Sequence, residues 1–117
     1  MDIKTYLKEH FLPDWDGYDA EPISDEACEY AQQIYNYFEL KPDPGADPDG
    51  MVNLEWYKKD DYQLGLSVDK FGNCYYAFID YTNNDKEHGQ FDIKDINFIK
   101  KFRFFSNDSL QTPQNDI

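Results

Sequence analysis

The spacing of apolar side chains predicts two helices in the first third of the chain. Residues 2–10 and residues 25–39 each carry apolar positions three or four residues apart, which places those side chains on one face of a helix. The second segment is long enough for an amphipathic helix of several turns. The apolar positions of the two segments are Ile3, Tyr6, Leu7, Ala27, Ala31, Ile34 and Phe38.

Past residue 50 the pattern changes to the alternation that is typical of strands. Residues 51–57 and 62–68 place an apolar side chain at every second position, which predicts two strands with one buried face. Residues 73–81 are apolar on both sides and predict a third strand that is either central in the sheet or covered on both faces. Residues 82–89 are expected to form a loop, and residues 90–93 predict a short fourth strand. The segment 41–50 is expected to be a loop, because its prolines and glycines interrupt regular structure.

Together these elements predict a single domain of the α+β class. A last helix is expected from Asp95, its N-cap, to about residue 105, which gives the order α-α-β-β-β-β-α. Short turns join the strands, so we expect an antiparallel β-meander of three to four strands with the helices packed on one face. Residues 1–105 would form this domain, and the polar residues 106–117 a flexible C-terminal tail.

An aromatic and acidic stretch, residues 15–24, separates the first two predicted helices. Pro22 disfavours a helical conformation for the residue before it, and Ser24 is well placed to cap the second helix. Trp15 and Tyr18 allow two interpretations: they pin the loop to the core, or they form an exposed aromatic surface for a partner. We favour the first interpretation for Trp15 and leave both open for Tyr18.

This stretch resembles an element with the pattern WDGYxAxPxS, found in small acidic bacterial and phage-borne proteins of unsettled function. The resemblance covers about residues 12–68, and Asp19 departs from it by standing where the pattern has a small residue. It implies an amphipathic helix after the element and a sheet with a strand similar to Leu54-Glu55-Trp56. It implies no activity. The residues that carry it are Trp15, Asp16, Gly17, Tyr18, Ala20, Pro22 and Ser24.

The protein is strongly acidic, and its charge is unevenly distributed. There are 24 acidic and 11 basic residues, for a formal net charge of −13. Residues 1–50 hold 13 acids and 3 bases, whereas residues 51–117 hold 11 acids and 8 bases. Phosphate contacts need lysine and arginine, so direct binding of nucleic acid or of an anionic membrane is disfavoured. A basic partner protein is favoured, although the need for solubility alone also accounts for such a charge.

The known motifs of catalysis and of metal binding are incomplete or missing in this sequence. A calcium loop that starts at Asp14 has Tyr18 where an oxygen ligand is needed and Asp19 where glycine is needed. The two cysteines and two histidines lack the paired spacing of zinc ligands. Neither a glycine-rich phosphate loop nor a GxSxG element is present. We therefore expect that the protein has no cofactor or metal ion and is not an enzyme. Glycosidase-type catalysis by two carboxylates stays open, because the fold determines which carboxylates lie close together.

The same sequence features bear on location. No apolar run approaches the roughly 20 residues that cross a bilayer, and the N-terminus lacks the basic and apolar pattern of a signal peptide. Cys28 and Cys74 fall on apolar faces of different elements and are expected to be buried thiols rather than a disulfide. The expected location is the cytoplasm.

The first functional hypothesis is a non-enzymatic inhibitor that binds a basic, nucleic-acid-handling protein. Its carboxylates would occlude the surface that otherwise binds nucleic acid, as in anti-CRISPR proteins, DNA mimics, antitoxins and immunity proteins. Aromatic side chains would supply short-range binding energy. The residues expected at this interface are Asp14, Trp15, Asp16, Tyr18, Asp19, Glu21, Asp43, Asp47 and Asp49.

The alternative hypothesis is a small ligand-binding domain or enzyme that uses a tyrosine-lined pocket on the sheet. Ten tyrosines occur in the chain, and several lie in or beside the predicted strands. A buried carboxylate such as Asp80 would complete such a pocket. A third interpretation, a structural accessory subunit, predicts an exposed apolar patch rather than an acidic one.

Overall fold

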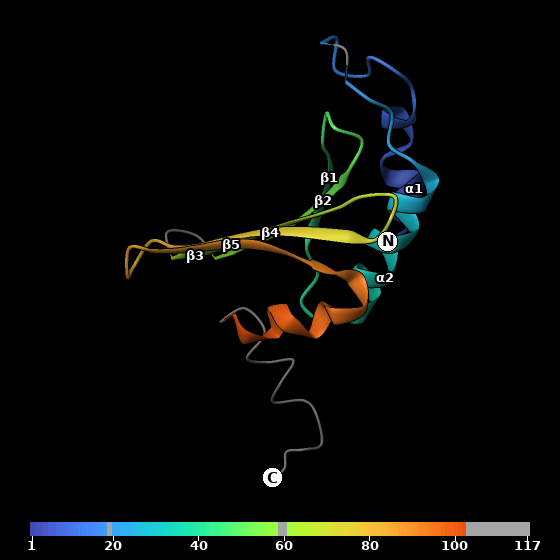
Figure 1. Cartoon of the computed structure of the whole chain (residues 1–117). Helices are drawn as coiled ribbons and strands as arrows, with labels where there is room; N and C mark the ends of the chain where they lie inside the picture. Colours follow the sequence, from blue (N-terminus) through green and yellow to red (C-terminus); the bar gives the residue numbers. More distant parts are fainter. Residues whose placement is uncertain (19, 59–60, 103–117) are drawn as a thin grey trace.

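The computed structural model describes residues 1–18, 20–58 and 61–102, which form an α+β domain (Figure 1). Helical segments open and close this part of the chain, and the strands lie between them. The elements in order are α1 (Ile3–Tyr6), the 3-10 helix η1 (Lys8–Phe11), α2 (Asp25–Tyr37), β1 (Asp43–Ala46), β2 (Val52–Lys58), β3 (Tyr62–Val68), β4 (Asn73–Asp80), β5 (Asp85–Asp92) and the 3-10 helix η2 (Ile93–Lys101).

The strands form one antiparallel sheet in the order β1-β2-β3-β4-β5. This confirms the predicted meander, with five strands in place of three to four. The additional strand is β1, where the sequence predicted only a loop. Pro44 lacks a backbone N–H, but β1 lies at the edge of the sheet, where a proline is tolerated. Proline content therefore misled the prediction, because it argues against a central strand and not against an edge strand.

Two further strand predictions need correction. β5 begins at Asp85, within a segment that was expected to be a loop, because its alternate positions are mostly polar and give no strand signal. β4 lies between β3 and β5 inside the sheet, which matches one of its two expected placements, but cover on both faces is wrong, because only one face of it is buried. Tyr75 and Ala77 are exposed, whereas Cys74 and Phe78 on the other side are buried. Apolar character alone did not distinguish a covered face from an exposed face that carries tyrosine and alanine.

The helix predictions are confirmed in position and corrected in detail. Ser24 caps α2 as expected, since its hydroxyl accepts a hydrogen bond from the Ala27 amide. The first helix is only one α-helical turn, followed by η1. The last helix is a 3-10 helix capped by Asp92 rather than by Asp95, which lies at a kink inside it. It ends at Lys101, earlier than the expected residue 105, and the expected tail 106–117 lies outside the described residues.

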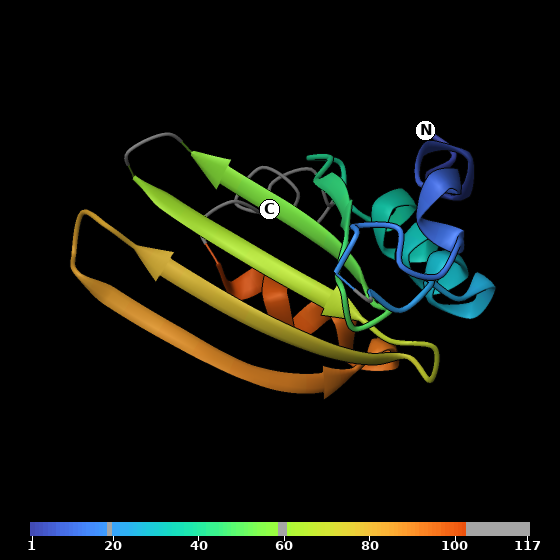
Figure 2. The ribbon, with the colours of Figure 1, turned by 90° about the horizontal axis from the view of Figure 1, so that it is seen from above.

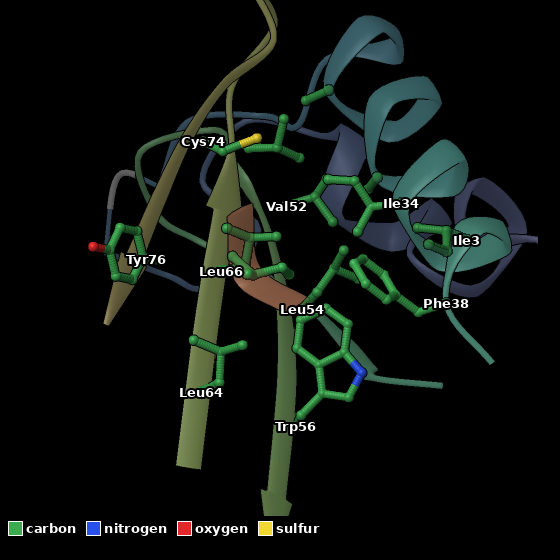
Figure 3. Close-up of a cluster of buried hydrophobic side chains, with 14 of the residues drawn as sticks. Ile3, Ile34, Phe38, Val52, Leu54, Trp56, Leu64, Leu66, Cys74 and Tyr76 are labelled. Carbon is green, nitrogen blue, oxygen red and sulfur yellow. The ribbon is translucent and has the colours of Figure 1, made fainter. Parts of the chain in front are cut away.

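The hydrophobic core lies between one face of the sheet and the helices (Figure 3). Trp56 is its largest buried side chain; its ring meets the Phe38 ring edge-on, with centroids 5.6 Å apart, and its indole N–H donates to the Leu40 carbonyl at 2.8 Å. Ile3 and Ile34 pack beside Phe38 in the same cluster. The core therefore joins the helical segments to β2 and β3.

The other face of the sheet is the open face of the molecule. Figure 2 looks onto it, with η2 behind the strands, and no element within the described ranges lies over β3–β5 there. The β1–β2 hairpin rises from the plane of β3–β5 (Figure 1). By their register, the open face carries the residues Asn53, Glu55, Gln63, Gly65, Ser67, Tyr75, Ala77, His88 and Gln90.

The N-cap at Ser24 predicts a measurable contribution to stability. Replacing Ser24 by alanine leaves the Ala27 amide without its acceptor and is expected to lower the free energy of unfolding by about 1 kcal/mol. Urea denaturation measures this change. Ser24→Asp keeps an acceptor at the cap and serves as the control, and an alanine variant with the stability of the native protein would contradict the assignment.

Both cysteines are free and buried, as predicted, which makes their thiols unreactive in the folded state. Burial raises the pKa of Cys28 to about 11 and that of Cys74 to about 12. At about pH 8 we expect a disulfide reagent to modify neither thiol in the native protein and both thiols after denaturation, because the thiolate is the reactive form. Rapid modification of the native protein would overturn the burial of that cysteine.

Candidate functional site

The loop that carries the predicted acidic and aromatic residues is held together by its own carboxylate. The side chain of Asp16 accepts hydrogen bonds from the amides of Tyr18 at 2.8 Å and Ala20 at 3.2 Å. Gly17, which lies between Asp16 and Tyr18, has a φ of 78°, which glycine adopts without strain. The Asp14 amide donates to the Ala20 carbonyl and closes the loop. Asp16 therefore has a structural role inside the loop, whatever it binds outside.

The structure separates the roles of the two aromatic residues in this loop. The indole N–H of Trp15 donates to the Glu21 carbonyl at 2.9 Å, and its ring meets the His10 ring edge-on, with the centroids 4.5 Å apart. Trp15 thus fastens the loop, as the favoured interpretation had it. Tyr18 has an exposed fraction of 88 % and presents its ring to solvent. Of the two, Tyr18 is the more exposed, whereas Trp15 is half-buried.

Two acidic loops far apart in the sequence lie side by side. The Glu21 amide donates to the Pro48 carbonyl at 2.8 Å, which joins the first loop to the β1–β2 turn (Figures 1 and 2). A Cβ on Gly50 would lie 3.2 Å from the Pro22 carbonyl oxygen, so the two backbones are nearly in contact. We call the surface formed by the carboxylates of both loops the acidic end. Its residues are Asp14, Asp16, Glu21, Asp47 and Asp49.

The two remaining predicted acids do not belong to this group. Asp43 begins β1, about 10 Å of extended chain from Ala46, and pairs with Glu55 on β2. A hydrogen bond with Asp43 raises the pKa of the Tyr57 phenol. Asp43 therefore belongs to the edge of the sheet rather than to the acidic end. Asp19 lies outside the described residues.

Sequence and structure together make the acidic end a region of concentrated negative charge. No lysine or arginine occurs between Lys8 and Lys41, or between Lys41 and Lys58, so neither loop carries a basic residue of its own. The pKa of Asp47 is raised, first by partial burial and then by the negative charge of Asp49. The raised pKa thus reflects chiefly the partial burial of this carboxylate and, to a lesser extent, its negatively charged neighbour.

A hollow of about 330 Å³ lies on the open face where the hairpin meets the flat part of the sheet. Asp47 lines it from the hairpin, so the hollow and the acidic end share one carboxylate. Asn53 and Glu55 lie on the β2 side, with Gly65 on β3 and Tyr75 and Ala77 on β4. The sequence analysis missed Glu55 and this hollow. An isolated glycine inside a strand, Gly65, was the available signal, since it often marks space for a close neighbour.

The strand tyrosines of the alternative hypothesis are divided between the two faces of the sheet. Tyr62 and Tyr76 belong to the core, whereas Tyr75 lies on the open face and the Tyr81 hydroxyl donates to Gln63 there. Asp80 is buried, as that hypothesis required. Its carboxylate accepts hydrogen bonds from the amides of residues 82 and 83, however, and so caps the β4–β5 turn.

On the core side, a second hollow of about 270 Å³ lies beside β5 and η2. Glu87 on its wall accepts hydrogen bonds from the Tyr76 hydroxyl at 2.7 Å and from the Lys101 ammonium at 2.5 Å. Burial, followed by the bond to Glu87, raises the pKa of Tyr76 to about 12. These contacts fasten η2 to the end of the sheet and give Glu87 a structural role.

The described part of the chain has neither a metal-binding cluster nor a membrane-spanning helix. Within residues 1–18, 20–58 and 61–102, no three histidine, cysteine or carboxylate side chains are grouped so that they could hold a metal ion. None of the helices in those ranges has the length and apolar character to cross a membrane.

Comparisons with known proteins yield no relative. No protein-family model, no curated protein and no solved structure matches the chain. The resemblance of residues 15–24 to the WDGYxAxPxS element thus stays a prediction, and the functional argument rests on the geometry of the acidic end and the open face.

The raised pKa of Asp47 predicts how the free energy of unfolding depends on pH. A carboxyl group whose pKa is raised by folding destabilises the native state once the pH exceeds its unfolded pKa of about 3.9, because the unfolded chain ionises more readily. Asp47→Asn is therefore expected to be more stable than the native protein at neutral pH and equally stable at about pH 3. Chemical denaturation at both pH values measures the difference. Asp85→Asn, an equal charge change on β5, is the control, and an equal gain from both variants would refute the local explanation.

Proposed function

We propose that this protein is a non-enzymatic inhibitor that binds a basic, nucleic-acid-handling protein and occludes its nucleic-acid-binding surface. Anti-CRISPR proteins, DNA mimics, antitoxins and immunity proteins act in this general way. The observation that carries the proposal is the acidic end, where the Glu21–Pro48 hydrogen bond places two acidic loops side by side. An array of carboxylates is a surface that lysine and arginine side chains bind in place of phosphates.

Long-range attraction and short-range contacts would contribute to binding in different ways. The net charge of −13 attracts a basic partner over distances of about one Debye length, roughly 8 Å at physiological salt, and so raises the association rate. At contact, the exposed ring of Tyr18 offers apolar area beside the carboxylates. Asp14, Glu21 and Asp49 are the exposed acids of the acidic end and are proposed to make the direct contacts. Trp15 and Asp16 are proposed to hold the loop in shape.

A specific observation also supports the alternative of a small ligand-binding domain or enzyme. The hollow on the open face is lined by one tyrosine side chain of that face, Tyr75, and its volume of about 330 Å³ is that of a small-molecule site. Its wide opening and the position of Asp80 in a turn, away from the hollow, favour the inhibitor proposal over this alternative.

Binding experiments with native partners test the inhibitor proposal. The tagged protein is used to capture partners from its native host in the presence of nuclease, at low and high salt, and the captured protein is then purified. The variant Asp14→Asn/Glu21→Gln/Asp49→Asn is expected to bind it at least about tenfold more weakly, equivalent to about 1.4 kcal/mol. The matched control, Glu29→Gln/Asp85→Asn/Asp95→Asn, removes the same charge elsewhere and is expected to retain the affinity.

Two results would contradict the proposal. Equal affinity of both triple variants at physiological salt would show that the acidic end is not the interface. A partner that still binds nucleic acid in the complex would show that occlusion is not the mechanism.

A further inference from the structure

The hollow on the open face exists because two small residues stand at its centre. Gly65 on β3 pairs with Ala77 on β4, and a Cβ built on Gly65 meets no atom within 4 Å. Glycine within a strand destabilises it relative to alanine, and Gly65 is not among the residues that have a positive φ angle. The backbone conformation therefore does not account for Gly65, whereas the space above it does.

The rim of the hollow is acidic and aromatic. Glu55 pairs with Gly65 across β2 and β3, so its side chain rises from the same face beside the gap. Asp47 on the hairpin and Tyr75 on β4 also line the hollow. One Glu55 oxygen accepts a long hydrogen bond of 3.2 Å from Gln63, which leaves most of the acceptor capacity of the carboxylate for a ligand.

These features select the chemistry of an occupant. The two carboxylates that line the hollow, Asp47 and Glu55, repel an anion and attract a cation. A guanidinium group suits the site better than an ammonium group, because it is planar, can stack on the Tyr75 ring and can donate two parallel hydrogen bonds to one carboxylate. Gly65 and Ala77 carry little or no side chain, which leaves room for the flat guanidinium group to lie over them.

We propose that the hollow between Glu55, Gly65 and Tyr75 receives an arginine side chain of the basic partner protein. The proposal deepens the inhibitor function and rests on it, because it names an anchor for the same partner next to the acidic end. Asp47 belongs to both surfaces, so a partner that docks on Asp49 and Glu21 would have one arginine within reach of the hollow. The acidic end would attract the partner, and the hollow would fix its orientation.

Nuclear magnetic resonance of the full-length protein tests the hollow without knowledge of the partner. The probe is a blocked Gly-Arg-Gly tripeptide at constant ionic strength, and the reference is the same peptide with citrulline, which is neutral and nearly the same shape. We expect the arginine peptide to shift the amide signals of Gly65, Ser67 and Ala77, and the citrulline peptide to bind at least tenfold more weakly. Equal binding of the two peptides, or shifts confined to other residues, would overturn the proposal.

Two variants address the same hollow by different means. Gly65→Val fills the gap with a residue that strands favour, and Glu55→Gln removes the charge on the rim, so each is expected to weaken the arginine peptide at least tenfold. Glu29→Gln on α2 is the charge control and is expected to leave binding unchanged. Retained binding by Glu55→Gln would refute the proposal even if Gly65→Val failed to fold.

The purified partner separates this proposal from the function on which it rests. Loss of partner affinity in the acidic-end variant, but not in Glu55→Gln or Gly65→Val, would overturn the arginine anchor and keep the inhibitor function. Peptide binding in the hollow together with full partner affinity in the acidic-end variant would overturn the inhibitor function instead. Free methylguanidinium that binds as tightly as the peptide, with unchanged partner affinity in the hollow variants, would assign the hollow to a small cation and overturn the partner anchor.

Discussion

The burial of one face of the sheet is the constraint on which the rest of this structure depends. Trp56 and its neighbours on β2 and β3 pack against α2, and the aromatic residues Tyr76 and Phe78 on β4 pack against η2. Side chains alternate along a strand, so a face committed to the core fixes which residues appear on the other face. The open face, with its polar side chains and its small central residues, is the direct consequence.

The same packing determines where the negative charge gathers. α2 lies against β2, so the loop that leads into α2 meets the turn between β1 and β2 at one end of the molecule. Backbone hydrogen bonds and the Asp16 carboxylate hold the loop, which leaves other acids exposed. Charges that are fixed by a rigid backbone lose little conformational entropy on binding, which favours a role in recognition.

The proposed partner surface is therefore one region with two kinds of chemistry. The acidic end carries exposed carboxylates and the Tyr18 ring. The hollow is lined by two carboxylates and a tyrosine, and small residues form its base. Charge at the surface chiefly raises association rates and is screened by salt, whereas a shaped site of this kind limits dissociation. The two parts would thus contribute to affinity and to specificity in different ways.

The sequence by itself determined the α+β class, the antiparallel order of the main strands, the cap at Ser24 and the burial of both cysteines, because each follows from local periodicity or local hydrogen bonding. It could not determine β1 or the full length of β5, because edge strands need neither continuous apolar residues nor every backbone N–H. Only the tertiary structure placed Glu21 beside Pro48, separated Asp43 from the other acids and opened the space above Gly65. These are contacts between segments distant in the chain, and they depend on how the layers pack rather than on any pattern along the sequence.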